Sequence, residues 1–183
     1  MNIDTSPVSE PESVRLQKVT LKYVEEQDRL AMLAEDSDGR SYAFWITRRL
    51  MSVLITHFTD LFSADSKKSQ HQKMIDNLML ESEAQSAIQN HDKNTPPVNS
   101  DDLVEQVLVT TLDISHSDSL VALTWRTADK QFQLALTHSE FFQWFAAIKR
   151  TLHEAQWMLI WPSWLDATDE LDFEGHGDKP AMH

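Results

Sequence analysis

Residues 41–58, SYAFWITRRLMSVLITHF, change from one hydrophobic period to another within a single short stretch. Tyr42, Phe44 and Ile46 lie at every second position, which predicts a strand with one buried face. From Thr47 onward the apolar residues recur at i, i+3, i+4 and i+7, which predicts an amphipathic helix. The Thr47 hydroxyl can accept a backbone N–H at the start of that helix. The stretch therefore predicts a strand that leads directly into a helix lying across the sheet.

Two more strands are predicted before this stretch. Residues 14–24 alternate apolar and polar side chains, and residues 29–35 form a second apolar run. Asp38 and Gly39 between apolar runs predict a tight hairpin, because both central residues of such a turn need positive φ. The first unit, residues 14–64, is therefore predicted to be a three-stranded β-meander followed by a helix.

The same plan recurs about ninety residues later along the chain. Residues 105–115, 119–127 and 130–136 predict three more strands, and Thr137 with Glu140 predicts a capping box that starts a second helix. The second and third strands match at an offset of ninety, in the pairs Leu30 and Leu120, Leu33 and Leu123, Tyr42 and Phe132, Phe44 and Leu134, Ile46 and Leu136, Thr47 and Thr137. The first strands match at an offset of 91, in the pairs Thr20 and Thr111, Leu21 and Leu112, Tyr23 and Ile114. Both an internal duplication and the convergence of two ordinary segments explain this match.

The rest of the chain divides into a middle segment and two ends. Residues 66–89 contain no glycine or proline and space their apolar residues at near-helical intervals, which predicts a third, more exposed helix. Residues 90–102, with Pro96 and Pro97, predict a flexible linker. The polar, acidic ends at 1–13 and 166–183 are expected to be disordered tails.

These elements predict one α+β domain over residues 14–165. It is expected to consist of two pseudo-symmetric antiparallel βββ-α units, at 14–64 and 105–165, that form one core, with a middle helix and linker at 65–104. Edge strands of such a sheet must be paired or covered, so we expect a homodimer.

The composition narrows the possible partners. The chain has 183 residues and a net charge of −13, and its two ends at 1–13 and 161–183 carry −8 of that charge. This balance disfavours nucleic acid and anionic membranes as partners of the whole molecule. There is no cysteine, no apolar run of membrane-spanning length and no signal peptide, so a cytoplasmic location is expected.

No pattern of catalytic residues stands out. The three glycines form no phosphate-binding loop before a helix, and no Gly-x-Ser-x-Gly elbow is present. The eight histidines show neither His-x-x-x-His nor Glu-x-x-His spacing, so no metal site is predicted. We therefore predict no catalytic residue, no cofactor and no metal ligand, and we expect a protein that is not an enzyme.

Three tryptophans near the C-terminal end form the first candidate interaction site. Trp157, Trp161 and Trp164 lie within eight residues of one another and precede an acidic run. Tryptophan is enriched at the hot spots of protein interfaces, so the segment could be an exposed partner-binding motif. Alternatively it closes the sheet or fills the core of the other unit, because a monomer rarely exposes so much apolar surface. Our leading hypothesis is a non-catalytic protein-interaction or assembly module.

Basic residues of the first unit form the second candidate site. They are Lys18, Lys22, Arg40, Arg48 and Arg49, with Trp45 among them. Such residues usually form a solvated face, but they could also form a basic sheet face that binds single-stranded nucleic acid, with bases stacked on Trp45 or Trp125. This is the alternative function. A small-molecule pocket between the two halves is the third possibility.

Parts of the first unit carry a family resemblance. The residues Tyr23, Asp28-Arg29-Leu30, Gly39-Arg40 and Trp45-Ile46-Thr47-Arg48-Arg49 resemble a signature of small uncharacterised proteobacterial proteins, which implies no activity. In topology alone, tandem meander-plus-helix units resemble the Whirly and Pur-type nucleic-acid-binding folds. That resemblance implies basic and aromatic residues on an open sheet face, and the net charge of −13 argues against it.

Overall fold

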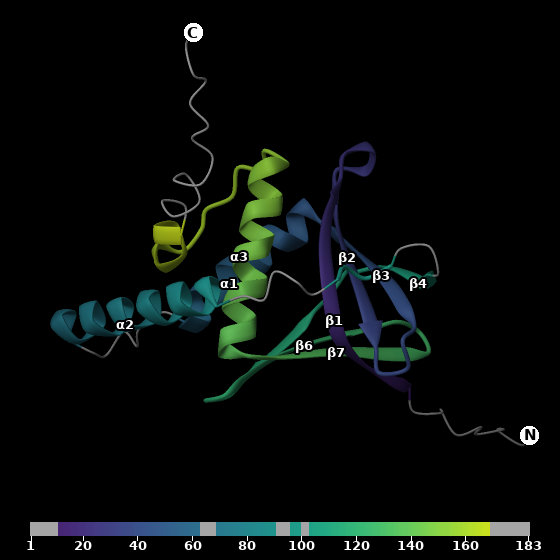
Figure 1. Ribbon diagram of the computed structural model, residues 1–183, viewed down its shortest axis with the longest axis horizontal. Coiled ribbons are helices and arrows are strands. Elements are labelled where there is room, and N and C mark those ends of the chain that lie inside the picture. The colour runs from purple at the N-terminus through teal and green to yellow at the C-terminus, as the bar shows by residue number, and fades with distance from the viewer. Residues whose placement is uncertain (1–10, 63–68, 91–95, 100–102, 169–183) are drawn as a thin grey trace, which may run out of the picture.

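The structure is a computed structural model that describes residues 11–62, 69–90, 96–99 and 103–168 (Figure 1). Of the disordered tails expected at 1–13 and 166–183, residues 1–10 and 169–183 lie outside the described residues, whereas residues 12–13 belong to a strand and 166–168 to a short helix. The elements in chain order are β1 (Glu12–Val24), η1 (Glu25–Gln27), β2 (Arg29–Asp36), β3 (Ser41–Thr47), α1 (Arg48–Phe62), α2 (Gln70–Gln89), β4 (Leu103–Leu108), β5 (Asp113–His116), β6 (Leu120–Arg126), β7 (Lys130–Thr137), α3 (His138–Glu154) and η2 (Ser163–Thr168). The predicted α+β class is confirmed: the described residues form one mixed seven-stranded sheet and three α-helices.

The sheet curls strongly because its two outermost strands are neighbours in the chain. The strand order is β4-β3-β2-β1-β7-β6-β5, and only residues 109–112 separate β4 from β5. A flat sheet of this order would place its outer strands roughly 29 Å apart, at about 4.8 Å per strand. The chain from Leu108 to Asp113 spans at most about 18 Å. The sheet therefore has to bend back toward itself.

Two segments of the chain each divide their pairing between the two halves of the sheet. β1 pairs in parallel with β7 over Glu12–Leu16 and antiparallel with β2 from Leu16 to Val24. In the same way, β4 pairs in parallel with β3, whereas β5 pairs antiparallel with β6. The single strand predicted at 105–115 is therefore wrong, because the chain breaks at 109–112 to cross from one edge to the other. β1 also begins two residues before the expected boundary at residue 14.

The apolar faces predicted for the strands and for the two helices that follow them pack together in one core. Phe44 meets Trp125 and Phe132 edge-on, with ring centroids 4.7 and 5.0 Å apart, so β3 is joined to β6 and β7. Phe58 of α1 contacts Phe141 of α3 in the same manner at 5.0 Å. α1 and α3 lie on one side of the sheet, and α2 extends away from it (Figure 1).

Both predicted helix starts are confirmed. The Leu50 N–H donates to the Thr47 hydroxyl, at 3.3 Å. Thr137 and Glu140 form a complete capping box, in which each side chain satisfies a backbone N–H of the other residue. These caps explain why the change of hydrophobic period locates the two strand–helix junctions so well.

The tight two-residue turn predicted at Asp38-Gly39 is wrong. Four residues connect β2 to β3, and of that pair only Gly39 has positive φ, at 78°. The buried Asp36 carboxylate accepts the backbone N–H groups of Asp38 and Arg40, at 2.9 and 3.0 Å, and the Tyr42 hydroxyl, at 3.0 Å. Burial raises the pKa of Asp36, but these hydrogen bonds outweigh it and lower the pKa overall. A carboxylate thus organises the wider loop.

The offset of ninety fails for the second strands of the two halves. Leu30 is fully buried, whereas Leu120 is 42% exposed. Leu30 pairs with Ile46, and Val121 pairs with Leu136, so β2 and β6 correspond at an offset of 91. The reason is that three residues connect β6 to β7, one fewer than connect β2 to β3.

Candidate functional site

The three tryptophans proposed as an exposed motif lie in or against the core. Trp157 and Trp164 are buried, and Trp161 is half-buried with its ring 5.5 Å from Phe145. The Trp164 ring packs against Phe142, at 5.4 Å. The exposed-motif interpretation is therefore wrong for Trp157 and Trp164, whose apolar rings complete the core beside α3.

Trp157 also ties the end of α3 to the first hairpin. Its indole N–H donates to the Asp28 carboxylate at 2.7 Å, and the Tyr23 hydroxyl donates to the same oxygen at 2.9 Å. The indole, the phenol and the nearby Arg48 charge lower the pKa of Asp28. The Tyr23 ring meets the Trp157 ring edge-on at 6.0 Å. Residues of the resemblance signature thus have a structural role here.

The outer face of the first three strands is partly covered by the chain itself. Residues 96–99, expected to belong to a flexible linker, cross this face and bury Val98 against Leu33 and Ala43. The Val98 N–H donates to the Thr20 hydroxyl at 2.9 Å, and the Lys18 ammonium lies 3.5 Å from the Pro97 carbonyl oxygen. This cover occupies the middle of the face that the nucleic-acid hypothesis needs.

The predicted basic set is scattered over several surfaces. Lys22 remains exposed on β1, in register through Ala31 with the half-buried Trp45, whose indole N–H donates to Gln106 at 3.2 Å. Arg40 lies at the hairpin end, 2.8 Å from Asp36 and 3.0 Å from Asp38. The exposed residues Arg48 and Arg49 begin α1. Trp125 is buried among core rings, so the suggestion that it stacks bases on an open face is wrong.

The most exposed apolar face among the described helices belongs to α2. Its inner side buries Ala84 and Ala87 against the rest of the fold. Its outer side exposes Met74, Ile75, Leu78 and Met79; Leu78 is 59% exposed and Met79 67%. We call this outer side, with the groove along it, the α2 face.

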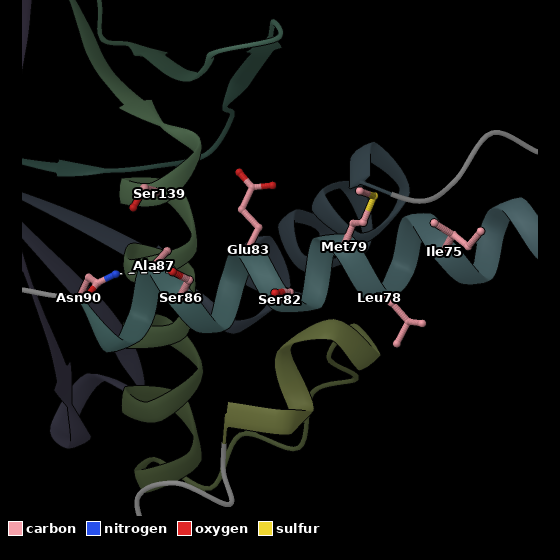
Figure 2. A pocket seen from close by; sticks show the side chains of 9 residues that line it. All are labelled: Ile75, Leu78, Met79, Ser82, Glu83, Ser86, Ala87, Asn90 and Ser139. Carbon is pink, nitrogen blue, oxygen red and sulfur yellow. Dashed lines mark hydrogen bonds between the residues drawn. The ribbon is translucent and has the colours of Figure 1, made fainter.

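A groove of about 690 Å³ runs along the α2 face toward α3 (Figure 2). Ile75, Leu78 and Met79 line one end, and the small side chains of Ser82 and Ser86 line the other. The large side chains project at one end of the groove, and the small serines leave the other end recessed. Such a shape suits apolar side chains of a partner.

The charges at the edges of this groove are acidic. Glu83 lines the groove and is exposed (Figure 2). Asp76, seven residues earlier and so on the same side of the helix, is half-buried and accepts a hydrogen bond from Gln72 at 3.0 Å. The helix has one cation, Lys73, which is half-buried and falls on the helical stripe of the inner residue Ala84. The α2 face therefore presents apolar surface with a negative edge.

Sequence reasoning predicted an exposed third helix but not its surface. The expected helix at 66–89 is observed as α2, which begins at Gln70 after the N-cap Ser69. On a helix, Ile75, Leu78 and Met79 lie opposite Ala84 and Ala87. Plotting the apolar residues around the helix axis would have separated these two groups. The larger group is the one that the fold leaves outside.

Within the described ranges, no group of three or more His, Cys, Asp or Glu side chains is placed to hold a metal ion. No helix in that part of the chain combines the length and the hydropathy needed to cross a membrane. Comparison of the chain with protein-family models, with curated proteins and with solved structures finds no match.

Proposed function

We propose that the protein is a non-catalytic protein-binding module and that the α2 face is its binding surface. The observation that carries the proposal is the concentration of four large, exposed apolar side chains on one helix. Contiguous apolar surface of this kind marks interaction sites more often than it is left free in solution. In the competing segment Trp157 and Trp164 are buried and cannot serve as anchors, so its exposed apolar residues are Met158 and Ile160 alone.

The partner that fits the α2 face is an amphipathic helix with basic flanks. Helical partners bind in grooves through apolar residues at i, i+3, i+4 and i+7. Such residues could contact Ile75, Leu78 and Met79 and fill the recessed end at Ser82 and Ser86. The exposed Glu83 in this groove favours Lys or Arg beside those anchors. A second copy of this chain is the weaker candidate, because two α2 faces would bring acidic edges together.

The proposal is tested with two labelled peptides that share leucines at i, i+4 and i+7 and differ only in lysine or glutamate flanks. Fluorescence anisotropy should show that the lysine peptide binds and that the glutamate peptide binds at least about tenfold more weakly. Leu78→Ser combined with Met79→Ser should abolish binding. Val53→Ser, which removes an equally exposed apolar residue from α1, should leave it unchanged.

Three results would contradict this assignment. Equal affinity for both peptides removes the charge argument, and an unaffected double variant removes the α2 face. Sedimentation equilibrium provides the third, if it detects a concentration-dependent dimer that Leu78→Ser dissociates, because the surface then belongs to a second copy. The homodimer expected from the edge strands would be supported in that case.

We also propose that the two halves, β1–β3 with α1 and β5–β7 with α3, derive from one duplicated unit. The helices bury matching positions at an offset of ninety, in the pairs Met51 and Phe141, Leu54 and Trp144, Ile55 and Phe145, Phe58 and Ile148. The divided pairing of β1 and of residues 103–116 supports the same view. Related chains whose halves share these positions less than expected by chance would contradict it.

A further inference from the structure

A cavity of about 610 Å³ lies between β1 and α3, on a different part of the molecule from the α2 groove's apolar end. It forms where β1 stops pairing with β7 after Leu16 and continues only with β2. Residues 18–21 then have a strand partner on one edge only, among the described strands, and Gln17 falls at a register shift. The other edge and one face of α3 form the walls. Its volume falls within the range of natural small-molecule sites, roughly 300–1,000 Å³.

The wall formed by α3 combines apolar and polar side chains from one face of the helix. Its residues recur at helical spacing and combine apolar surface from Trp144 and Ala147 with polar ends from Gln143, Arg150 and Thr151. Trp144 is nine-tenths buried, and its indole N–H has no hydrogen-bond partner within the described structure. Because that nitrogen is itself closed to solvent, Trp144 offers the cavity the apolar surface of its ring and not a hydrogen-bond donor.

Two cations stand among the described residues that line this cavity, in a chain whose net charge is −13. They are Lys18 on β1 and Arg150 on α3, and neither forms an ion pair with any residue that the structure describes. The one acid among the described lining residues is Glu140, whose carboxylate accepts the Thr137 N–H and hydroxyl, both at 2.8 Å. The capping box fixes the position of this carboxylate through its Oε2, so the described lining holds two cations against one anchored acid.

The cations do not follow from the architecture of the fold. At the offset of ninety that relates α1 to α3, Arg150 corresponds to Asp60, and Trp144 corresponds to Leu54. A feature needed only to join helix to sheet would recur in both halves, but this combination of cation and indole occurs in one. The other half therefore forms its helix and sheet without this cation and this indole.

We propose that this cavity binds a small organic anion, with its acidic group at Lys18 and Arg150 and a flat apolar body against Trp144. Charge-assisted hydrogen bonds to the two cations supply specificity, and burial of the body against the indole and Ala147 supplies affinity. This proposal is independent of the α2 face, because the α2 residues that carry the protein-binding proposal do not line the cavity.

The test compares 2-naphthoate with 2-naphthamide, which have nearly the same shape and differ in charge. Titration calorimetry should show binding of 2-naphthoate and at least about tenfold weaker binding of 2-naphthamide. In 1H–15N spectra the Trp144 indole signal, assigned with Trp144→Phe, should move as 2-naphthoate is added. Equal affinities, no binding of either compound, or an unmoved Trp144 signal would each overturn the proposal.

Variants locate the site. Lys18→Gln with Arg150→Gln should weaken 2-naphthoate by at least about tenfold and leave 2-naphthamide unchanged. Arg49→Gln removes an exposed cation from α1 and serves as the matched control. Leu78→Ser should leave the affinity for 2-naphthoate unchanged, which separates this site from the α2 face. If Arg49→Gln weakens binding as much as the double variant does, the attraction is general and the proposal fails.

Discussion

Helices α3 and α2 have similar lengths, 17 and 20 residues, but they use their apolar side chains in opposite ways. α3 buries its large rings, among them Phe141, Phe142 and Phe145, in the core. α2 buries two alanines and leaves its methionines and Leu78 outside. Small side chains give a close approach with little buried area, so α2 is attached to the fold but adds little to its core.

The buried residues of α3 stabilise the fold, whereas the outer residues of α2 are available to bind a partner. Replacing a core ring of α3 disturbs every element that touches it, because protein interiors are tightly packed. Replacing an outer residue of α2 changes a surface without creating a cavity. Measuring stability and binding on the same variants therefore tests whether the two helices really have these separate roles.

The largest effect is expected for Phe145→Ala on α3. Phe145 is fully buried and contacts Phe58 of α1 and Trp161 of the following segment. Losing the ring leaves a cavity between these elements and should lower the free energy of unfolding by about 3–5 kcal/mol. Urea unfolding followed by tryptophan fluorescence measures this. A loss under about 1 kcal/mol would contradict the central role of α3.

A smaller and more local effect is expected for Ala84→Asp on the inner side of α2. Ala84 is fully buried, so the substitution places a carboxylate where α2 packs against the fold. α2 should detach at a cost of about 2–3 kcal/mol while the sheet persists. Hydrogen exchange should show loss of protection in α2 and unchanged protection in β2 and β3. Unfolding of the whole chain would show that α2 belongs to the core as α3 does.

The elements that sequence predicted best are those in which local and tertiary signals agree. The strand-to-helix changes at Thr47 and Thr137 combine a change of period with a side-chain cap, and both are confirmed. The single strand at 105–115 was wrong because its two ends pair with strands far apart in the sheet. No local pattern records which strand will be the partner, so the crossing at 109–112 leaves no signal in alternation alone.

The candidate sites were harder to predict for the same reason. Trp157 has the composition of a hot spot, but a partner 129 residues away, Asp28, binds its indole within the fold. The alternation of β1 predicts Lys18 on an open sheet face, but residues 96–99 cross that face, and Lys18 is also one of the residues that line the cavity. α2 shows the opposite case, since its outer face could have been found by plotting Ile75, Leu78 and Met79 around the helix axis.

The chain that follows α3 is joined to the first hairpin by the hydrogen bond from the Trp157 indole to Asp28, and Trp157→Phe tests this contact. Removing the indole N–H takes away the first cause of the lowered Asp28 pKa, so this pKa should rise toward its ordinary value. A carboxyl with a lowered pKa stabilises the fold above its unfolded-state pKa, near 3.9, and loses this contribution as the pH falls through the folded-state pKa. The stability difference between Trp157→Phe and the native chain should therefore shrink on acidification. Carboxyl NMR titration of Asp28 measures the shift, and an unchanged pKa would contradict the role of the indole.

The smallest effect on stability is expected for Leu78→Ser, and this makes it the sharpest test of the contrast between α2 and α3. Leu78 is mostly exposed and lies on the side of α2 away from Ala84, so the free energy of unfolding should change by less than about 0.5 kcal/mol. Binding of the lysine-flanked peptide should nevertheless fall, whereas the more stability-sensitive Phe145→Ala, studied below its unfolding midpoint, should keep it. If Leu78→Ser destabilised the chain as much as Ala84→Asp, the outer side of α2 would be covered within the fold. Its apolar residues would then serve the core, as those of α3 do.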